Sequence, residues 1–436
     1  MRLRNLVSAC CALVLIQFPL TIPQLIATEL TDTEIGQFRA LLEEKRLAAP
    51  ARTGPLTGEE TSVLRGFLEQ FKGMTFGGYV DNYYQYESVN PSPGDSRAIP
   101  PKLYDKQVNS FTVKNIELWL HKNAPNPGDV GFKITLNWGD IARHLTPIGP
   151  VHDDFAVQPN PPATPTGGRQ TTFSEAYVLW NAPAGKGVTI KFGKFPDWIG
   201  YERHGSIWNP NYSDGYTNGK VPPARSTGLN VSYDVTDKFS AGYYLVNTTG
   251  TFVNNNKSFT HGLELDYVLP DLAFFKNAYV KLGTVWGPEH ASNDSDWRQI
   301  YDLTISFSPF HKLTLVTNTN FFYDPTEIVQ PSGRAKKDNH AWGVVEYVVY
   351  EHTDWLGFAV RGEYFWDQEN LVGLNGSDGA SMAEVTGTIN LRLREKLMVR
   401  PEVRYDKIIH VPNASSHVWH RQNKNITGLI GVSYEF

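Results

Sequence analysis

The last nine residues, 428–436, alternate between two kinds of side chain. Ile430, Val432, Tyr434 and Phe436 are apolar, and the residues between them are small or polar. A period of two predicts a β-strand with one apolar face. A last strand that ends on an aromatic residue is typical of the closing strand of a bacterial outer-membrane barrel, with Phe436 at the membrane interface. An ordinary edge strand is the alternative at this point.

The same alternation recurs upstream, and there the polar face is charged. In 382–394, 397–406 and 355–367, one face is apolar and the other carries charges of both signs. A soluble sandwich would turn the apolar face inward, whereas a membrane barrel turns it toward lipid and lines a water-filled lumen with the charges. The charged residues on these faces are Arg361, Glu363, Glu384, Arg392, Arg400, Glu402 and Arg404. Their density favours the barrel.

The region from residue 74 to the end reads as about sixteen strands. Long polar connections alternate with very short ones, which is the layout of an up-and-down membrane barrel. We therefore predict an all-β, transmembrane antiparallel β-barrel of about 16 strands. The predicted strands are 74–86, 110–122, 130–140, 171–182, 187–195, 226–234, 239–247, 260–268, 277–287, 297–307, 312–323, 340–350, 355–367, 382–394, 397–406 and 425–436.

The N-terminal part of the chain differs from the rest. Residues 1–27 have a short basic start, an apolar stretch and a small-residue site, which predicts a secretory signal peptide. Residues 28–73 show apolar residues at helical spacing behind a capping box at 31–34. We interpret 28–73 as a helical periplasmic segment that is a tether, a plug or an oligomerisation element, and 74–436 as the barrel.

Composition excludes other classes of protein. Both cysteines, Cys10 and Cys11, lie in the predicted signal peptide, so a disulfide-stapled secreted fold is excluded. The net charge of −5 argues against nucleic acid as a partner. After the signal peptide no stretch of about 18 residues is apolar throughout, which excludes membrane-spanning helices.

One stretch also resembles a known family. Gly193-Lys194-Phe195 is followed by Ile-Gly-Tyr-Glu at 199–202, Asn-Tyr-Ser at 211–213 and a strand opening with Thr227-Gly228. This progression, with the start of the first strand at 77–81, resembles the putative β-barrel porin-2 family over about residues 74–436. Where that family leads us to expect Ser-Arg-Ser-like residues, this chain has Asp-Gly-Tyr at 214–216. The resemblance implies an outer-membrane porin and leaves the solute open.

In a porin the narrowest zone sets selectivity. We expect the loop 196–225 to form that constriction, and its candidate residues are Asp197, Glu202, Arg203, Trp208, Tyr212, Asp214 and Arg225. The charged residues of the strand faces named above would form the opposing lumen wall. Two interpretations of the wall arginines stay open: they set anion preference, or they form a salt-bridge ladder with the neighbouring glutamates that stiffens the barrel. The loop aromatics either contact passing solutes or pack on one another.

Catalytic and metal motifs are not apparent. The twelve histidines are scattered, and the chain has no Gly-x-Ser-x-Gly, His-Glu-x-x-His or phosphate-binding loop. We therefore expect no enzyme activity, no cofactor and no metal. The expected function is passive diffusion of small polar solutes or ions; the alternative is a non-conducting surface barrel or secreted β-domain that acts as an adhesin or sugar binder. Expected partners are outer-membrane lipid and lipopolysaccharide, the barrel-assembly machinery through the C-terminal strand, and further copies of the chain.

Overall fold

The computed structural model describes residues 73–89, 104–105, 107–142, 171–223, 225–249, 253–272, 274–325, 327–329, 335–367, 371, 379–410 and 423–436. The predicted signal peptide and all but the last residue of the predicted helical segment lie outside this part of the chain. The chain divides into two compact units, residues 1–77 with 119–123 and residues 78–118 with 124–436. The contacts described below all belong to the second unit.

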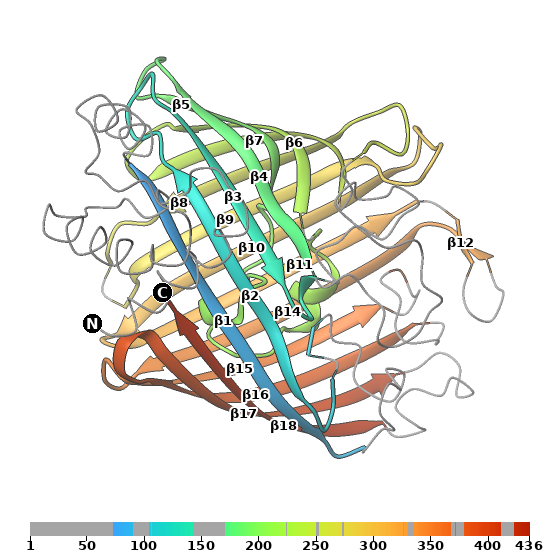
Figure 1. The fold of residues 1–436 in the computed structure, drawn as a ribbon. Coiled ribbons are helices and arrows are strands. Elements are labelled where there is room, and N and C mark those ends of the chain that lie inside the picture. The colour runs from blue at the N-terminus through green and yellow to red at the C-terminus, as the bar shows by residue number, and fades with distance from the viewer. Residues whose placement is uncertain are drawn as a thin grey trace, which may run out of the picture. The chain divides into compact units, whose positions relative to one another are not determined.

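Sixteen antiparallel strands form a closed barrel, which confirms the predicted fold and strand number (Figure 1). Strands that follow one another along the chain are neighbours in the sheet, and β1 pairs with β18 to close it. The strands are β1 Met74–Glu87, β2 Phe111–Lys122, β3 Val130–Trp138, β4 Thr171–Ala182, β5 Val188–Pro196, β6 Arg225–Asp234, β7 Phe239–Thr249, β8 Thr260–Val268, β9 Lys276–Pro288, β10 Trp297–Phe310, β11 Leu313–Asp324, β14 Asn339–Glu351, β15 Leu356–Asp367, β16 Ala380–Arg392, β17 Leu397–His410 and β18 Lys424–Glu435.

The connections are short at one end of the barrel and long at the other. Two of the short turns place a lysine in the left-handed region, Lys312 at φ 67° and Lys396 at φ 66°, and the second lies in the 3₁₀-helix η4 Arg394–Lys396. The predicted long connection between β11 and β14 contains a small hairpin, β12 Ile328–Val329 and β13 Ala335–Lys336. Among the described residues, no helix has the length and apolar character needed to cross a membrane.

Closure of the sheet depends on the two ends of the barrel sequence. The register between β1 and β18 runs from Tyr79 opposite Glu435 to Glu87 opposite Thr427. Beyond it, the backbone N–H of Phe436 donates to the carbonyl of Gly78 at 2.9 Å, and the N–H of Gly78 donates back at 3.2 Å. Because each strand has two neighbours, the sheet has no unpaired edge.

The two faces of the barrel have the opposite polarity to those of a soluble domain. Large apolar side chains such as Phe192, Val385 and Val403 are 66, 56 and 60 % exposed on the outward face. On the inward face, Arg361 and Arg404 are completely buried. The outward-facing Trp180, Trp342 and Trp355 also remain exposed, toward strand ends. Apolar outside and charged inside is the arrangement that the strand alternation predicts for a barrel in lipid.

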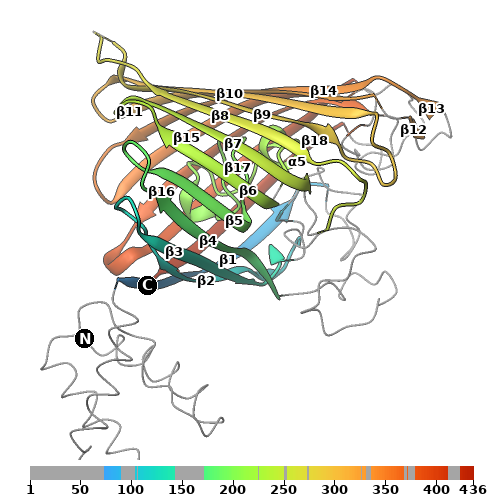
Figure 2. The ribbon, with the colours of Figure 1, turned by 90° about the horizontal axis from the view of Figure 1, so that it is seen from above.

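The buried interior is formed by the wall and a segment of chain that enters it. Residues 197–223, here called the inner segment, connect β5 to β6 and contain the 3₁₀-helix η3 Ser206–Trp208 and the short helix α5 Tyr216–Lys220. Figure 2, seen from above, shows α5 within the ring of strands. Inward-facing glycines of the wall make room for this segment, because a Cβ on Gly262 or Gly431 would overlap the ring of Trp198 or Tyr212.

We predict that Gly262→Ala destabilises the protein by about 1–3 kcal/mol, because the added methyl group overpacks the wall against Trp198. The measurement is thermal unfolding, followed by loss of the β-sheet circular dichroism signal. Gly428→Ala is the matched control, since its Cβ would have no atom within 4 Å. Equal unfolding temperatures for the two variants would contradict the close packing of the Trp198 ring against Gly262.

Candidate functional site

Arg361 of β15 joins the inner segment to the wall. Its guanidinium donates to Glu384 of β16 at 2.5 Å, to Glu202 of the inner segment at 2.6 Å and to the carbonyl of Ser213 at 2.5 Å. The second oxygen of Glu202 accepts the backbone N–H of Gly215 at 2.8 Å. Burial raises the pKa of the Glu202 carboxyl, and Arg361 opposes that shift. Arg361 therefore neutralises one wall carboxylate and one loop carboxylate together.

Arg400 of β17 contacts the same segment further toward its start. Its Nη2 donates to the carbonyls of Asn209 and Pro210, both at 2.8 Å, and its Nη1 donates to the carbonyl of Ser206 at 2.5 Å. On the wall, its Nε donates to Asn390 Oδ1 at 2.7 Å. Since Arg400 is only 1 % exposed, these donors are used inside the protein.

Arg404, also on β17, holds the middle of the inner segment. Its Nη1 donates to the carbonyl of Asp214 at 2.6 Å, and its Nε donates to Asp406 Oδ1 at 2.8 Å. The guanidinium lies 4.8 Å from the centre of the Tyr216 ring, and Tyr216 also donates its hydroxyl to Asp406 at 2.5 Å. Glu384 lies 3.9 Å from Arg404, so it belongs to both arginine clusters.

Two wall carboxylates accept backbone amides of the inner segment. Glu363 of β15 accepts the N–H groups of Tyr216, at 2.6 Å, and Thr217. Glu402 of β17 accepts the N–H of Tyr212 at 2.6 Å. An irregular segment inside a barrel has no strand partner for these donors, and a buried amide without a partner is costly. The wall thus supplies the hydrogen bonds that the loop lacks.

Residues of β1 and β2 that the sequence analysis did not select complete this contact. The hydroxyl of Tyr212 donates to Asp81 of β1 at 3.0 Å. Lys114 of β2 donates to the carbonyl of Tyr212 at 3.3 Å, and its Nζ lies 4.3 Å from the centre of the ring. Asp81 and Lys114 are each followed by an asparagine, so the alternation around them is interrupted. The sequence also does not show which residues lie opposite them, because long connections separate their strands from the inner segment.

The aromatic residues of the inner segment differ in exposure. Tyr212 and Tyr216 are each 1 % exposed, and burial raises the pKa of both hydroxyls. Trp198 stacks on Tyr244 of β7 at 3.9 Å between ring centres. Trp208, by contrast, is 47 % exposed. Of these residues, Trp208 is the one whose ring presents a large surface to solvent.

The remaining predicted residues lie apart from these clusters. Asp197 is partly buried where the inner segment begins, and Arg225 opens β6 and donates to the carbonyl of Ser174 at 3.0 Å. Arg203 is exposed. Arg392 forms a half-exposed ion pair with Glu351, at 2.5 Å, at the short-turn end. The predicted site is therefore one group of loop and wall residues with four outliers.

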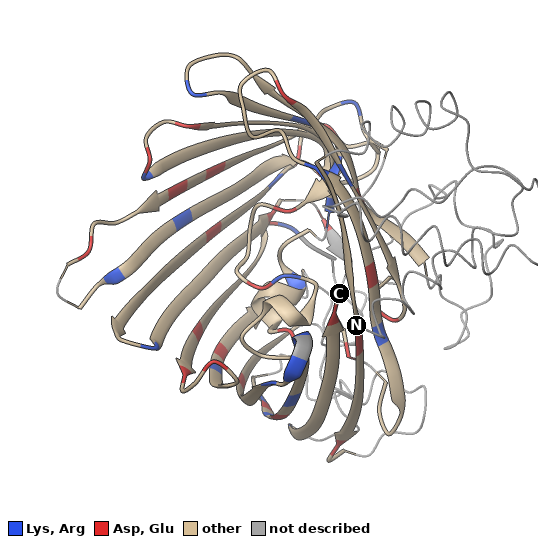
Figure 3. Ribbon diagram, turned by 60° about the vertical axis from the view of Figure 1, so that its left-hand side comes forward, with Lys and Arg blue, Asp and Glu red and all other residues tan. Residues whose placement is uncertain are grey.

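The opposite wall carries charged residues that sequence reasoning missed. Lys133 of β3 pairs with Glu175 of β4 at 2.7 Å, and Lys281 of β9 pairs with Glu264 of β8 at 2.8 Å. Between them, Lys191 of β5 lies 5.8 Å from the centre of the Tyr177 ring. The three lysines are only partly buried. Figure 3 shows the charged residues distributed along the strands of the barrel.

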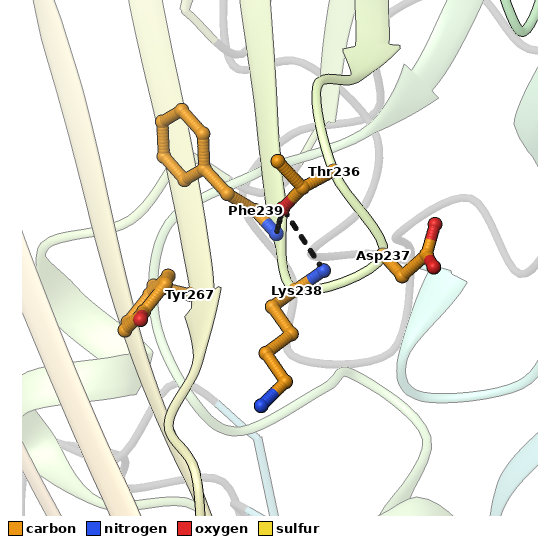
Figure 4. A pocket seen from close by; sticks show the side chains of 5 residues that line it. All are labelled: Thr236, Asp237, Lys238, Phe239 and Tyr267. Carbon is orange, nitrogen blue, oxygen red and sulfur yellow. Dashed lines mark hydrogen bonds between the residues drawn. The ribbon is translucent and has the colours of Figure 1, made fainter.

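Outside these clusters, the described chain has no feature that forms an equally well-built candidate site. A shallow pocket at the turn between β6 and β7 is lined by Thr236, Asp237, Lys238, Phe239 and Tyr267 (Figure 4). Its polar groups serve the turn, because the Thr236 hydroxyl oxygen accepts the N–H groups of Lys238 and Phe239. No group of three or more His, Cys, Asp or Glu residues in the described ranges is arranged to hold a metal ion.

Several solved structures have a similar fold, among them an outer membrane channel. The outer membrane channel DcaP of Acinetobacter baumannii has a TM-score of 0.55 at 12 % identity, over 83 % of this chain and 97 % of that one. OmpF of Salmonella typhi, in a complex with daunomycin, has a TM-score of 0.54 at 10 % identity, over 83 % of this chain and 97 % of that one. OprB of Pseudomonas putida has a TM-score of 0.53 at 11 % identity, over 87 % of this chain and 96 % of that one. At these identities the likeness shows the fold alone.

The family itself follows from the sequence. A search of curated proteins gives no match. The profile of the family described as putative beta-barrel porin-2, OmpL-like, matches residues 73–436, which include all sixteen strands of the barrel. The chain therefore belongs to the putative β-barrel porin-2 family and is a porin of the bacterial outer membrane.

Proposed function

We propose that the chain is a channel for passive diffusion, without enzyme activity, in which the inner segment forms the constriction. The supporting observation is the attachment of this segment to the inward face of β15, β17 and β1 by buried arginines and carboxylates. A segment held at so many points narrows the lumen permanently and is not displaced by each passing solute. Small polar solutes and ions then pass between it and the remaining wall.

The remaining wall is proposed as the lining of the path. Lys133, Lys191 and Lys281 with Glu175 and Glu264 are carried by β3–β5, β8 and β9. Polar and charged side chains replace part of the hydration of a solute and so lower the barrier to its passage. Lys191 has no ion pair among the described residues, which makes it the cation best placed to set ion preference.

In this proposal the wall arginines hold the inner segment and have little direct effect on selectivity. Arg361, Arg400 and Arg404 are at most 1 % exposed, and most of their guanidinium donors are used by oxygen atoms of the inner segment and the wall, although Nη2 of Arg404 has no hydrogen-bond partner among the described residues. The negative charge of the acidic residues of the inner segment is also reduced. Glu202 is paired with Arg361, and burial raises the pKa of Asp197 well above its usual value.

Partners follow from the proposed location. The outward apolar face would contact outer-membrane lipid and lipopolysaccharide. The C-terminal strand would be recognised by the barrel-assembly machinery, and copies of the chain would associate in the membrane. Residues 1–27 would be removed as a signal peptide, and 28–73 would remain in the periplasm.

We predict that the purified protein gives discrete conductance steps in a planar bilayer and that Lys191→Glu raises the cation-to-anion permeability ratio several-fold. The substitution reverses a partly buried charge on the proposed path. The reversal potential across a salt gradient measures this ratio. Lys186→Glu is the control, because Lys186 lies in an exposed turn ion pair with Asp237. A folded barrel that never conducts would refute the channel, and equal reversal potentials for both variants would refute the role of Lys191.

We predict that Arg361→Gln loosens the inner segment. Removing one partner of a buried ion pair leaves the carboxylates uncompensated, so the free energy of unfolding should fall by about 3–5 kcal/mol. Single-channel conductance should rise and become noisier. Arg392→Gln, which breaks a half-exposed pair, is the control and should change both quantities little. Unchanged conductance of Arg361→Gln would show that Arg361 is not needed to hold the inner segment in place.

We predict that Asp197→Asn removes a decline in stability that begins near the unfolded-chain pKa of about 3.9 and continues as the pH rises. Burial raises the folded-state pKa of Asp197, so the folded protein holds this proton after the unfolded chain has lost it. Stability is therefore highest below the unfolded pKa of about 3.9 and declines as the pH rises toward the folded pKa. Urea unfolding at several pH values measures this decline. Asp237→Asn is the control, since Lys186 lowers the pKa of that exposed carboxyl; a wild-type profile as flat as that of Asp197→Asn would contradict the prediction.

A further inference from the structure

One carboxylate inside the barrel is buried without an ion pair. Tyr301 of β10 is exposed on the outward face, so Asp302, the next residue, faces inward, and it is only 1 % exposed. Lys281 of β9 is opposite Thr304, two residues along from Asp302, and pairs with Glu264 instead, at 2.8 Å. No other cationic side chain in the described ranges forms an ion pair with Asp302. An uncompensated charge inside a protein is unfavourable, so this carboxylate needs a partner.

Hydrogen bonds satisfy only part of the Asp302 carboxylate. Asn318 of β11 donates from Nδ2 to Asp302 Oδ2 at 2.9 Å. The backbone amide of Gly200, in the inner segment, also interacts with the carboxyl group. Oδ1 of Asp302 has no hydrogen-bond partner among the described residues. Because a carboxylate has about four acceptor sites, much of its capacity remains unused.

Three neutral oxygen atoms near Asp302 are buried in the same condition. They are Oδ1 of Asn318, Oδ1 of Asn320 and Oγ1 of Thr217, and in the described part of the chain none of them has a hydrogen-bond partner. Asn318 contacts Asp302 through the hydrogen bond above, and Asn320 is directly opposite Asp302 in the register. The three residues are at most 3 % exposed.

Thr217 brings the inner segment to this group. Asn320 donates from Nδ2 to the carbonyl of Thr217 at 3.1 Å. Gly343 of β14 is opposite Asn320, and Oγ1 of Thr217 lies 2.2 Å from the position that a Cβ on Gly343 would take. The Thr217 hydroxyl therefore stands where the side chain opposite Asn320 would be, and such side chains have Cβ atoms about 4.5–5.5 Å apart. The oxygens thus belong to one small region between the wall and the inner segment.

The neighbouring side chains do not supply the hydrogens that these oxygens lack. The amide of Asn318 donates to Asp302 and to Thr304, and that of Asn320 donates to Thr217. The hydroxyl of Thr217 carries a single hydrogen. Buried oxygens without partners are costly. A metal cation satisfies several oxygens together, because each one directs a lone pair at it.

We propose that a sodium ion binds between the inner segment and the wall, held by oxygens of Asp302, Asn318, Asn320 and Thr217. Carboxylate, amide and hydroxyl oxygens are ligands of hard cations, and the set contains no nitrogen or sulfur ligand. One carboxylate balances one positive charge, so a monovalent ion leaves the buried group neutral. A divalent ion would leave it with an excess positive charge.

The ion joins the inner segment to β10 and β11, which the arginine clusters on β15 and β17 do not reach. The set has a single acidic residue and none of the histidine or acidic motifs from which the sequence analysis judged metal binding. The proposal does not depend on conduction, so its test is separate from that of the channel.

The first test is thermal unfolding of the purified protein in sodium chloride and in N-methylglucamine chloride at equal ionic strength, followed by circular dichroism. N-methylglucamine is too large for a buried site, so sodium should raise the unfolding temperature by several degrees. Asp302→Asn should lose this difference between the salts, because it removes the charged ligand. Asp324→Asn is the control and should keep the difference, since Asp324 is also a buried carboxylate of the lumen but pairs with Arg298 at 2.7 Å.

A second variant changes the charge of the site. Asn320→Asp supplies a second carboxylate, and the affinity of an oxygen site for Ca²⁺ depends on the number of charged ligands. In this variant calcium chloride should raise the unfolding temperature at a concentration about tenfold lower than in the wild type. Circular dichroism at low temperature checks that each variant is folded.

The outcomes decide the proposal. A sodium-dependent shift that Asp302→Asn loses and Asp324→Asn keeps, with a stronger calcium response in Asn320→Asp, supports the site. Equal unfolding temperatures of the wild type in the two salts overturn it, and mean that Asp302 is neutralised in another way, such as by a proton. A shift that Asp302→Asn retains, an equal loss in Asp324→Asn, or an unchanged calcium response in Asn320→Asp also overturns it. If Asp302→Asn does not fold, the wild type and Asn320→Asp still give the answer.

Discussion

The pairing of β1 with β18 is the interaction on which the rest of the structure depends. In lipid, every backbone amide and carbonyl of a spanning segment needs a partner within the protein, and an open sheet leaves a row of them unpaired at each edge. The Gly78–Phe436 hydrogen bonds and the register above them remove both edges. Once the sheet is closed, alternation along each strand assigns every side chain to lipid or to the lumen.

Closure also creates the electrostatic problem that the inner segment solves. Sixteen inward faces bring many charges together in a confined space, where unpaired charges are expensive. On one side of the lumen, Arg361 and Arg404 are neutralised by Glu202, Glu384 and Asp406. The same groups supply the hydrogen bonds that the irregular segment needs. On the other side, Lys133 and Lys281 pair with neighbouring carboxylates and keep partial contact with water.

The fold could be predicted because its signals are local. Strand alternation and the contrast of short and long connections are visible within about ten residues, and they located all sixteen strands. The inner segment was also recognised, from its aromatic residues and family-like motifs. The partners of its residues were not, because the register between strands joined by long loops is not contained in either strand alone. Lys191 and Glu264 were missed although Leu263-Glu264-Leu265-Asp266 alternates as clearly as the C-terminal strands.

Glu346 shows a different limit of sequence reasoning. It stands in the run Val344-Val345-Glu346-Tyr347-Val348, in which apolar residues occupy both faces. With no alternation the run does not tell which face is inward. The burial of Val345 and Tyr347 and the contact between Tyr347 and Asn218 of the inner segment settle the orientation.

The inward glycines have a consequence for how the barrel assembles. A strand that slips by two residues against its neighbour keeps every apolar side chain in lipid and every polar one in the lumen, so alternation alone does not detect the error. The slip would, however, move Gly262 or Gly431 about 7 Å along the wall and bring a side chain against Trp198 or Tyr212. The inner segment therefore fits inside the barrel only when these strands are paired in the correct register.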